Sequence, residues 1–122
     1  MGYNDILRKD PMELFCWLNQ EFSVSVPAEI ISAKDMDDAA KLLLKLTSYY
    51  SYLCSLLSYA KVLTRQVKRD CDKATYEDMI DRRDMIEAMQ KNVMQQYSAI
   101  SRAVTIHIEN NRELRMNATG GI

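Results

Sequence analysis

The sequence predicts an all-α protein, with a short N-terminal helix followed by a long antiparallel helical hairpin of the coiled-coil type. Three observations favour this fold. Glycine and proline are scarce, with three Gly and two Pro among 122 residues, and both residue types break helices. The remaining composition is rich in helix formers. Apolar residues recur at alternating spacings of three and four, typical of helices packed along their length. We expect one domain over residues 1–122, since this length is short for two.

Residues 1–34 are expected to form the N-terminal helix and a connector. Asp10 and Pro11 mark the helix start, because Asp can accept backbone N–H bonds and Pro suits the first helical position. The apolar face runs to about residue 22 and comprises Leu14, Phe15, Leu18 and Phe22, flanked by Trp17. Residues 23–27 alternate polar and apolar side chains and end in proline, so they predict an extended connector. We expect this segment to cap one side of the helix that follows.

The first long helix is predicted over residues 35–72. Ser32 and Asp35 resemble a capping box, and acidic residues suit the positive end of the helix dipole. An uncharged seam continues along the helix: Met36, Ala39, Leu43, Leu46, Tyr50, Leu53, Leu57, Ala60, Thr64, Val67 and Cys71. This seam predicts close packing against a second helix.

The middle of this helix, residues 46–60, contains four tyrosines and no formal charge. It is too short for a membrane span, which needs about 20 apolar residues. Further apolar side chains lie off the seam: Leu42, Leu44, Tyr49, Tyr52, Leu56, Tyr59 and Val62. The helix therefore needs a second neighbour, either another segment of this chain or another subunit. We favour a buried helix, with Tyr49, Tyr52, Leu56 and Tyr59 at an interface, over a platform for stacking bases.

The second long helix is predicted over residues 75–116, with a frayed tail at 117–122. Its seam is Met79, Arg83, Ile86, Gln90, Val93, Tyr97, Ile100, Val104 and Leu114, with Ala103 and Ile108 on the same side. This frame differs from that of the first seam, and Thr75 with Asp78 offers a new helix start. We therefore expect a turn at about residues 72–76. The absence of glycine and proline there favours the alternative, one continuous rod.

Residues that could carry chemistry are few. The chain has one histidine, His107, and its three cysteines lack a C-x-x-C spacing. Glycines occur only at positions 2, 120 and 121, so no phosphate-binding loop is present. We expect no catalytic residues, no metal, no cofactor and no enzymatic activity. The odd cysteine count and the lack of a signal peptide predict reduced thiols and a cytoplasmic location.

The distribution of charge is the remaining feature of the sequence that could indicate a function. The net charge is -1, which does not favour nucleic-acid binding over the whole surface. A local basic surface is predicted by Lys61, Arg65, Lys68, Arg69, Arg82 and Arg83, the last two facing the others across the hairpin tip. Such residues can neutralise phosphates and release counterions. The alternative is an ordinary solvated helix end, where basic residues suit the dipole and nearby acids dilute the patch.

The helical hairpin pattern followed by residues 97–116, YSAISRAVTIHIENNRELRM, resembles the C-terminal helix of the T4-type phage recombination mediators. The resemblance covers about residues 36–116. It implies a non-enzymatic phage accessory protein that oligomerises, binds single-stranded DNA and helps to load a recombinase. The six basic residues would then contact the DNA backbone, and the tyrosine-rich helix would be the subunit interface.

Two other functions fit the sequence. A small helical inhibitor or adaptor could dock its apolar faces onto a host or defence enzyme, with its acidic first third mimicking nucleic acid. Residues 1–36 carry six acids and three basic residues. A structural subunit that binds only copies of itself is the third possibility. None of these three readings involves a membrane.

Overall fold

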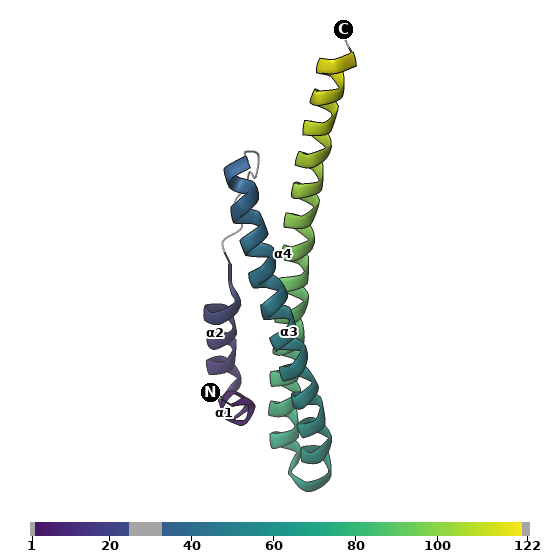
Figure 1. Ribbon diagram of the computed structural model, residues 1–122. Coiled ribbons are helices and arrows are strands. Elements are labelled where there is room, and N and C mark those ends of the chain that lie inside the picture. The colour runs from purple at the N-terminus through teal and green to yellow at the C-terminus, as the bar shows by residue number, and fades with distance from the viewer. Residues whose placement is uncertain (1, 25–32, 121–122) are drawn as a thin grey trace.

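The computed structural model describes residues 2–24 and 33–120, without the side chains of residues 33–35, 115 and 117–120. In this part of the chain it has four helices and no strand: α1 (Tyr3–Leu7), α2 (Pro11–Phe22), α3 (Ala33–Asp70) and α4 (Lys73–Gly120). α3 and α4 form a long antiparallel hairpin, and the two short helices lie along one side of it (Figure 1). The predicted all-α fold with a helical hairpin is therefore confirmed.

The N-terminal region contains one helix more than the sequence predicted. α1 has only five residues, too few to show a periodic apolar pattern, and it buries Ile6 and Leu7. α2 begins as expected, with Pro11 in the first turn and the Asp10 carboxylate accepting a hydrogen bond from the Glu13 backbone N–H at 2.9 Å. These two short helices form a corner that places apolar side chains against the hairpin.

The predicted apolar face of α2 needs one correction. Leu14, Leu18 and Phe22 are buried, whereas Phe15 is 52% exposed. Trp17 contributes instead, with its ring edge-on to Phe22 at a centroid distance of 5.6 Å. The face turned toward the hairpin is therefore narrower than the sequence pattern indicated. Residues 25–27 of the expected connector, and Ser32 of the expected capping box, lie outside the described residues.

The turn between α3 and α4 consists of Cys71 and Asp72, and it uses no residue with a positive φ among those described. Asp72 accepts a hydrogen bond from the Thr75 backbone N–H at 3.0 Å and so caps α4. Hydrogen bonds from the Thr75 hydroxyl and backbone N–H lower the pKa of Asp72. α4 thus begins at Lys73, not at the predicted residue 75, because Asp72 is the capping residue and Thr75 its partner.

The two predicted seams face each other in the hairpin. From Met36 to Val67 every seam position of α3 is buried or half-buried, and Cys71 is exposed because it lies in the turn. The α4 seam is buried or half-buried from Met79 to Val104. α3 and α4 therefore pack through the residues that the three-four spacing selected.

The C-terminal part of α4 continues past the level at which α3 begins (Figure 1). α4 has 48 residues and α3 has 38, and the helix continues to Gly120 through most of the expected frayed tail. Two residues that the sequence assigned to the seam side, Ile108 and Leu114, are 54% and 66% exposed. They lie where α4 has no facing stretch of α3 among the described residues.

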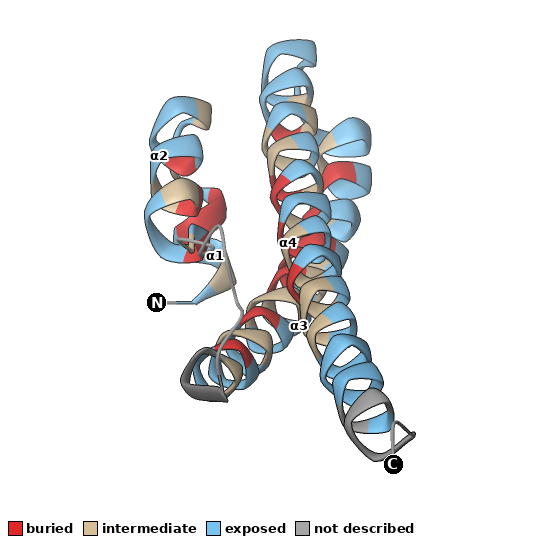
Figure 2. Ribbon diagram, turned by 90° about the horizontal axis from the view of Figure 1, so that it is seen from above, coloured by how far each residue is buried: buried red, intermediate tan, exposed pale blue. Residues whose placement is uncertain are grey.

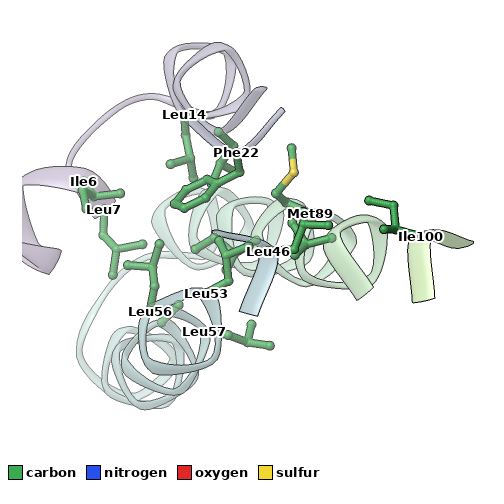
Figure 3. Packing of buried hydrophobic residues seen from close by; sticks show 14 of the residues in the cluster. Ile6, Leu7, Leu14, Phe22, Leu46, Leu53, Leu56, Leu57, Met89 and Ile100 are labelled. Carbon is green, nitrogen blue, oxygen red and sulfur yellow. The ribbon is translucent and has the colours of Figure 1, made fainter. Parts of the chain in front are cut away.

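A second layer covers the tyrosine-rich side of α3. Figure 2 shows buried positions where α1 and α2 face the hairpin and where α3 meets α4. Figure 3 shows Ile6, Leu7, Leu14 and Phe22 directed toward side chains of the hairpin, among them Leu56. The predicted second neighbour of the first long helix is thus present within the same chain. Leu44 and Val62, also expected to be covered, are 72% and 48% exposed.

Long helices raise the question of a membrane span. Over the stretches that the structure describes, no helix combines the length and the apolar character needed to cross a bilayer.

Candidate nucleic-acid interface

A hollow of about 370 Å³ lies between α3 and α4 near the turn of the hairpin. Its lining comprises Lys61, Thr64, Arg65, Lys68, Tyr76, Arg83 and Glu87, and we call it the tip hollow. Four cations and one carboxylate give this lining a formal charge of +3. The chain as a whole has a net charge of -1, so positive charge is concentrated here.

Helix periodicity brings the lining residues together. Lys61, Arg65 and Lys68 are separated by four and three residues, which places them on one side of α3. On α4, Tyr76 and Arg83 are seven residues apart and Glu87 follows after four more, so they also share one side. No residue of α1 or α2 lines the tip hollow, so the hollow is formed by the hairpin alone.

Thr64 forms the floor of the tip hollow. Its side chain is 4% exposed, and its hydroxyl donates a hydrogen bond to the Ala60 carbonyl at 2.7 Å. The hydroxyl proton is therefore used within α3, and the oxygen retains capacity to accept. The donors that a ligand would meet in this hollow are the cationic side chains around it and the Tyr76 hydroxyl.

The four cations differ in how far they are already paired. Arg83 pairs with Asp84 at 3.2 Å, and the Lys68 ammonium lies 6.0 Å from the centre of the Tyr76 ring. Lys61 and Arg65 are exposed and have no ion-pair partner among the described side chains. Arg83 is half-buried and Asp84 is exposed. Ion pairs close to solvent contribute little free energy, about 0–1 kcal/mol, so this pair can be exchanged for a ligand.

Glu87 is the one acid in the lining. Its carboxylate lies 3.9 Å from the Lys91 ammonium; the Lys91 side chain is exposed and Glu87 is half-buried. Lys91 thus partly offsets the negative charge that Glu87 brings to the hollow.

The structure brings together four of the six basic residues singled out by sequence: Lys61, Arg65, Lys68 and Arg83. Arg69 is exposed on the last turn of α3 and does not line the hollow. Arg82 faces the N-terminal corner, where its Nε–H donates to the Lys9 carbonyl at 2.8 Å. In the structure Arg82 thus lies apart from the other basic residues, because residues 82 and 83 project about 100° apart on α4.

Three lining residues were missed from the sequence: Thr64, Tyr76 and Glu87. Thr64 was assigned only to the packing seam. The spacing in the sequence could have located Tyr76 and Glu87. Tyr76 lies seven residues before Arg83, about two helical turns, and Glu87 lies four residues after it, about one turn, so all three share one side of α4.

The tyrosines expected at an interface contact α1 and α2 of the same chain. The Phe22 ring lies 5.1 Å from Tyr49 and 5.7 Å from Tyr52, and the Tyr3 ring lies 5.7 Å from Tyr52 and 5.6 Å from Tyr59. Leu56 is fully buried in the same layer. Within one chain, the four residues Tyr49, Tyr52, Leu56 and Tyr59 therefore form an interface between helices.

Where α1 and α2 pack on α3, two tyrosine hydroxyls have identifiable surroundings. The Tyr59 hydroxyl donates a hydrogen bond to the Asn4 side-chain carbonyl. Burial raises the pKa of Tyr52, and the nearby Tyr3 and Glu21 raise it further.

A second hollow of about 260 Å³ lies farther from the turn, between the same two helices. It is lined by Leu46, Thr47, Tyr50, Val93, Met94 and Tyr97, and we call it the mid-hairpin hollow. Tyr50 is thus the one tyrosine of residues 46–60 that lies away from α1 and α2. Its hydrogen bond with the Cys54 thiol raises its pKa, and the Gln90 amide donates to the Cys54 sulfur at 2.9 Å.

The histidine and the three cysteines do not form a cluster among the described residues. His107 lies 3.1 Å from the Asn111 amide one turn along α4, and Cys16, Cys54 and Cys71 are free thiols. Within residues 2–24 and 33–120, no three His, Cys, Asp or Glu side chains are grouped as metal ligands.

Comparison with protein-family models, with curated proteins and with solved structures finds no match to this chain.

Proposed function

We propose that this protein is a non-enzymatic accessory protein that binds single-stranded DNA at the tip hollow. The observation that carries the proposal is the convergence of four cations, from two helices, around one concave site. Lys and Arg side chains that neutralise phosphates release condensed counterions, and this supplies most of the affinity of sequence-independent binding.

Two features of the tip hollow favour a single strand. A concave site of about 370 Å³ between two helices can surround one phosphodiester backbone, whereas duplex recognition generally uses an element that projects into a groove. The Tyr76 ring beside Lys68 offers an aromatic surface, on which any base can stack. The resemblance of residues 97–116 to recombination mediators extends the proposal to delivery of a recombinase onto the bound strand, by an oligomer of this chain.

The test is a titration of a labelled oligothymidylate, followed by fluorescence anisotropy. The oligonucleotide should exceed the ~4–16 nucleotides that one such site covers. Four phosphate contacts at ~0.7 each predict that affinity falls roughly 50-fold between about 50 and 200 mM salt. The triple variant Lys61→Gln/Arg65→Gln/Lys68→Gln should lose most of this binding.

A charge-matched control separates the tip hollow from overall charge. Lys41, Arg102 and Arg112 are exposed and lie outside both hollows. Lys41→Gln/Arg102→Gln/Arg112→Gln changes the net charge by the same amount and should bind like the wild type. Equal losses in both triple variants, or no binding by the wild type at low salt, would refute the proposal.

A second candidate function is a helical adaptor or inhibitor that binds a host or defence enzyme. It is favoured by the apolar side chains at the far end of α4, where Ile106, Ile108 and Leu114 are each at least half exposed. This function predicts stable association with a protein from the host, lost on Ile108→Glu/Leu114→Glu, and no affinity for DNA.

A further inference from the structure

The mid-hairpin hollow and the tip hollow lie on the same side of the hairpin. On α3, Thr47, Tyr50 and Cys54 are followed by Lys61, Arg65 and Lys68 at spacings of three, four and seven residues. On α4 the same holds for Tyr76, Arg83, Glu87, Gln90, Met94 and Tyr97. Such spacings keep side chains on one side of a helix. A strand that leaves the tip hollow along the hairpin therefore reaches the mid-hairpin hollow.

The mid-hairpin hollow has the lining expected of a site for one aromatic ring system. Tyr50 and Tyr97 come from opposite helices and are half-buried, and the buried Leu46 and Val93 also line the hollow. Met94 is 41% exposed at the edge, where its thioether can contact a ring. The volume of about 260 Å³ is below the range of roughly 300–1,000 Å³ for drug-sized ligands.

The distance between the two hollows suits a short stretch of nucleic acid. Tyr50 precedes Lys61 by eleven residues and Lys68 by eighteen, or roughly 17–27 Å at ~1.5 Å per residue. A stacked strand advances ~3.4 Å per nucleotide, so this span corresponds to about five to eight nucleotides. Between the hollows lie Cys54 and Gln90, joined by their hydrogen bond.

We propose that the mid-hairpin hollow holds one nucleobase of the strand whose phosphates occupy the tip hollow, with the base against Tyr50 and Tyr97. This inference rests on the function proposed above. The tip hollow supplies affinity through charge, and the mid-hairpin hollow adds affinity that depends on a base being present. Stacking tolerates any base, because every base has a π-face.

The test compares oligothymidylates with matched strands that carry abasic sugars, over a series of lengths on either side of about eight nucleotides. The wild type should bind the longer thymidylate about five- to 150-fold more tightly than its abasic counterpart, the contribution of one stacked base. Strands too short to span both hollows should show a smaller difference, limited to a base stacked on Tyr76 in the tip hollow.

Two matched double variants test whether the difference in affinity between the two strands comes from the rings of Tyr50 and Tyr97. Tyr50→Leu/Tyr97→Leu keeps apolar packing but removes both rings, so it should lose the part of the preference for thymidylate that only the longer strands show. Tyr50→Phe/Tyr97→Phe keeps the rings and should retain the preference for thymidylate. Thermal unfolding followed by circular dichroism shows whether each variant is folded. If the leucine variant is unfolded, the inference is tested by the wild type alone, through its affinities for the thymidylate and abasic strands.

The outcomes separate this inference from the proposed function. Equal affinity for long thymidylate and abasic strands, with salt-dependent binding that the tip hollow variant loses, overturns the inference and leaves the proposed function standing. In that case the mid-hairpin hollow is better suited to an apolar side chain of a protein partner. Absence of binding to any strand overturns both.

Discussion

The Nε–H group of Arg82 donates a hydrogen bond to the backbone carbonyl of Lys9 at 2.8 Å and so joins residues that are 73 positions apart. Lys9 lies between α1 and α2, at the corner of the N-terminal layer. The bond ties this corner to α4, while Arg83, the next residue, lines the tip hollow. Two adjacent arginines thus have different roles, one in the fold and one in the proposed binding site.

We expect Arg82→Met to destabilise the protein by about 1.5 kcal/mol. This is the low end of the range for a hydrogen bond with a charged partner, because Arg82 is only half-buried. Methionine keeps the apolar stem, so the change reports mainly on the hydrogen bond. Chemical denaturation measures the free energy of unfolding.

Arg83→Met is the matched control for that change. Arg83 is also half-buried, but its partner Asp84 is exposed, so losing this ion pair should cost less than about 1 kcal/mol. The change should also weaken binding to single-stranded DNA. Identical effects of the two substitutions on both stability and binding would contradict the division of roles between Arg82 and Arg83.

Leu56 tests whether the N-terminal layer covers α3 in solution. Leu56→Ala should cost about 2–5 kcal/mol, because the side chain is fully buried and its removal leaves a cavity. Leu44→Ala on the same helix should cost about 0.5 kcal/mol or less, since Leu44 is 72% exposed. Similar unfolding free energies for both variants would show that the tyrosine-rich side is not covered.

The raised pKa of Tyr52 leads us to expect a loss of stability at alkaline pH. Burial, and then Tyr3 and Glu21, raise its pKa above the ordinary value of 10.0, so the folded chain holds this proton more tightly than the unfolded chain does. The resulting stabilisation is fully present below the unfolded-state pKa of about 10 and is lost as the pH rises through the folded-state pKa.

Melting temperatures measured from about pH 8 to about pH 11 check this prediction. Tyr52→Phe should flatten the decline above about pH 10, because phenylalanine has no proton to lose. An unchanged decline in the variant would show that Tyr52 does not contribute to it. Tyr50, whose pKa is also raised, is present in both proteins and accounts for a remaining slope.

Glu87 should oppose the binding of phosphates, because its carboxylate is the one acid that lines the tip hollow. Glu87→Gln is expected to tighten binding to single-stranded DNA several-fold at low salt, and less at high salt, where charges are screened. Glu109→Gln, an exposed position on α4 outside both hollows, is the control and should bind like the wild type. Weaker binding by Glu87→Gln would argue against phosphate in this hollow.

The sequence predicted the parts of the fold that depend on periodicity. The seam from Met36 to Val67 and the seam from Met79 to Val104 are buried or half-buried as expected, and the change of frame between them located the turn. α1 was missed because five residues span little more than one helical turn. Its contribution to the core, Ile6 and Leu7, carries no periodic signal of its own.

The candidate site was predicted in part, for a geometric reason. Lys61, Arg65, Lys68 and Arg69 fall within nine residues of one predicted helix, which needs no knowledge of packing, but only the first three line the tip hollow. The positions of Arg82 and Arg83 depend on where α1 and α2 lie around α4. The sequence likewise indicated that Tyr49, Tyr52 and Tyr59 needed a neighbour, but whether that neighbour is the N-terminal segment or another subunit depends on tertiary structure.

The salt dependence of binding tests most directly the central claim that four cations at the tip hollow contact phosphates. Affinity for a labelled oligothymidylate is measured at several salt concentrations for the wild type and for Lys61→Gln/Arg65→Gln/Lys68→Gln. The wild-type plot of log affinity against log salt should have a slope of about -2.8, and the loss of three contacts should reduce its magnitude by about 2. Equal slopes for the two proteins would contradict the claim.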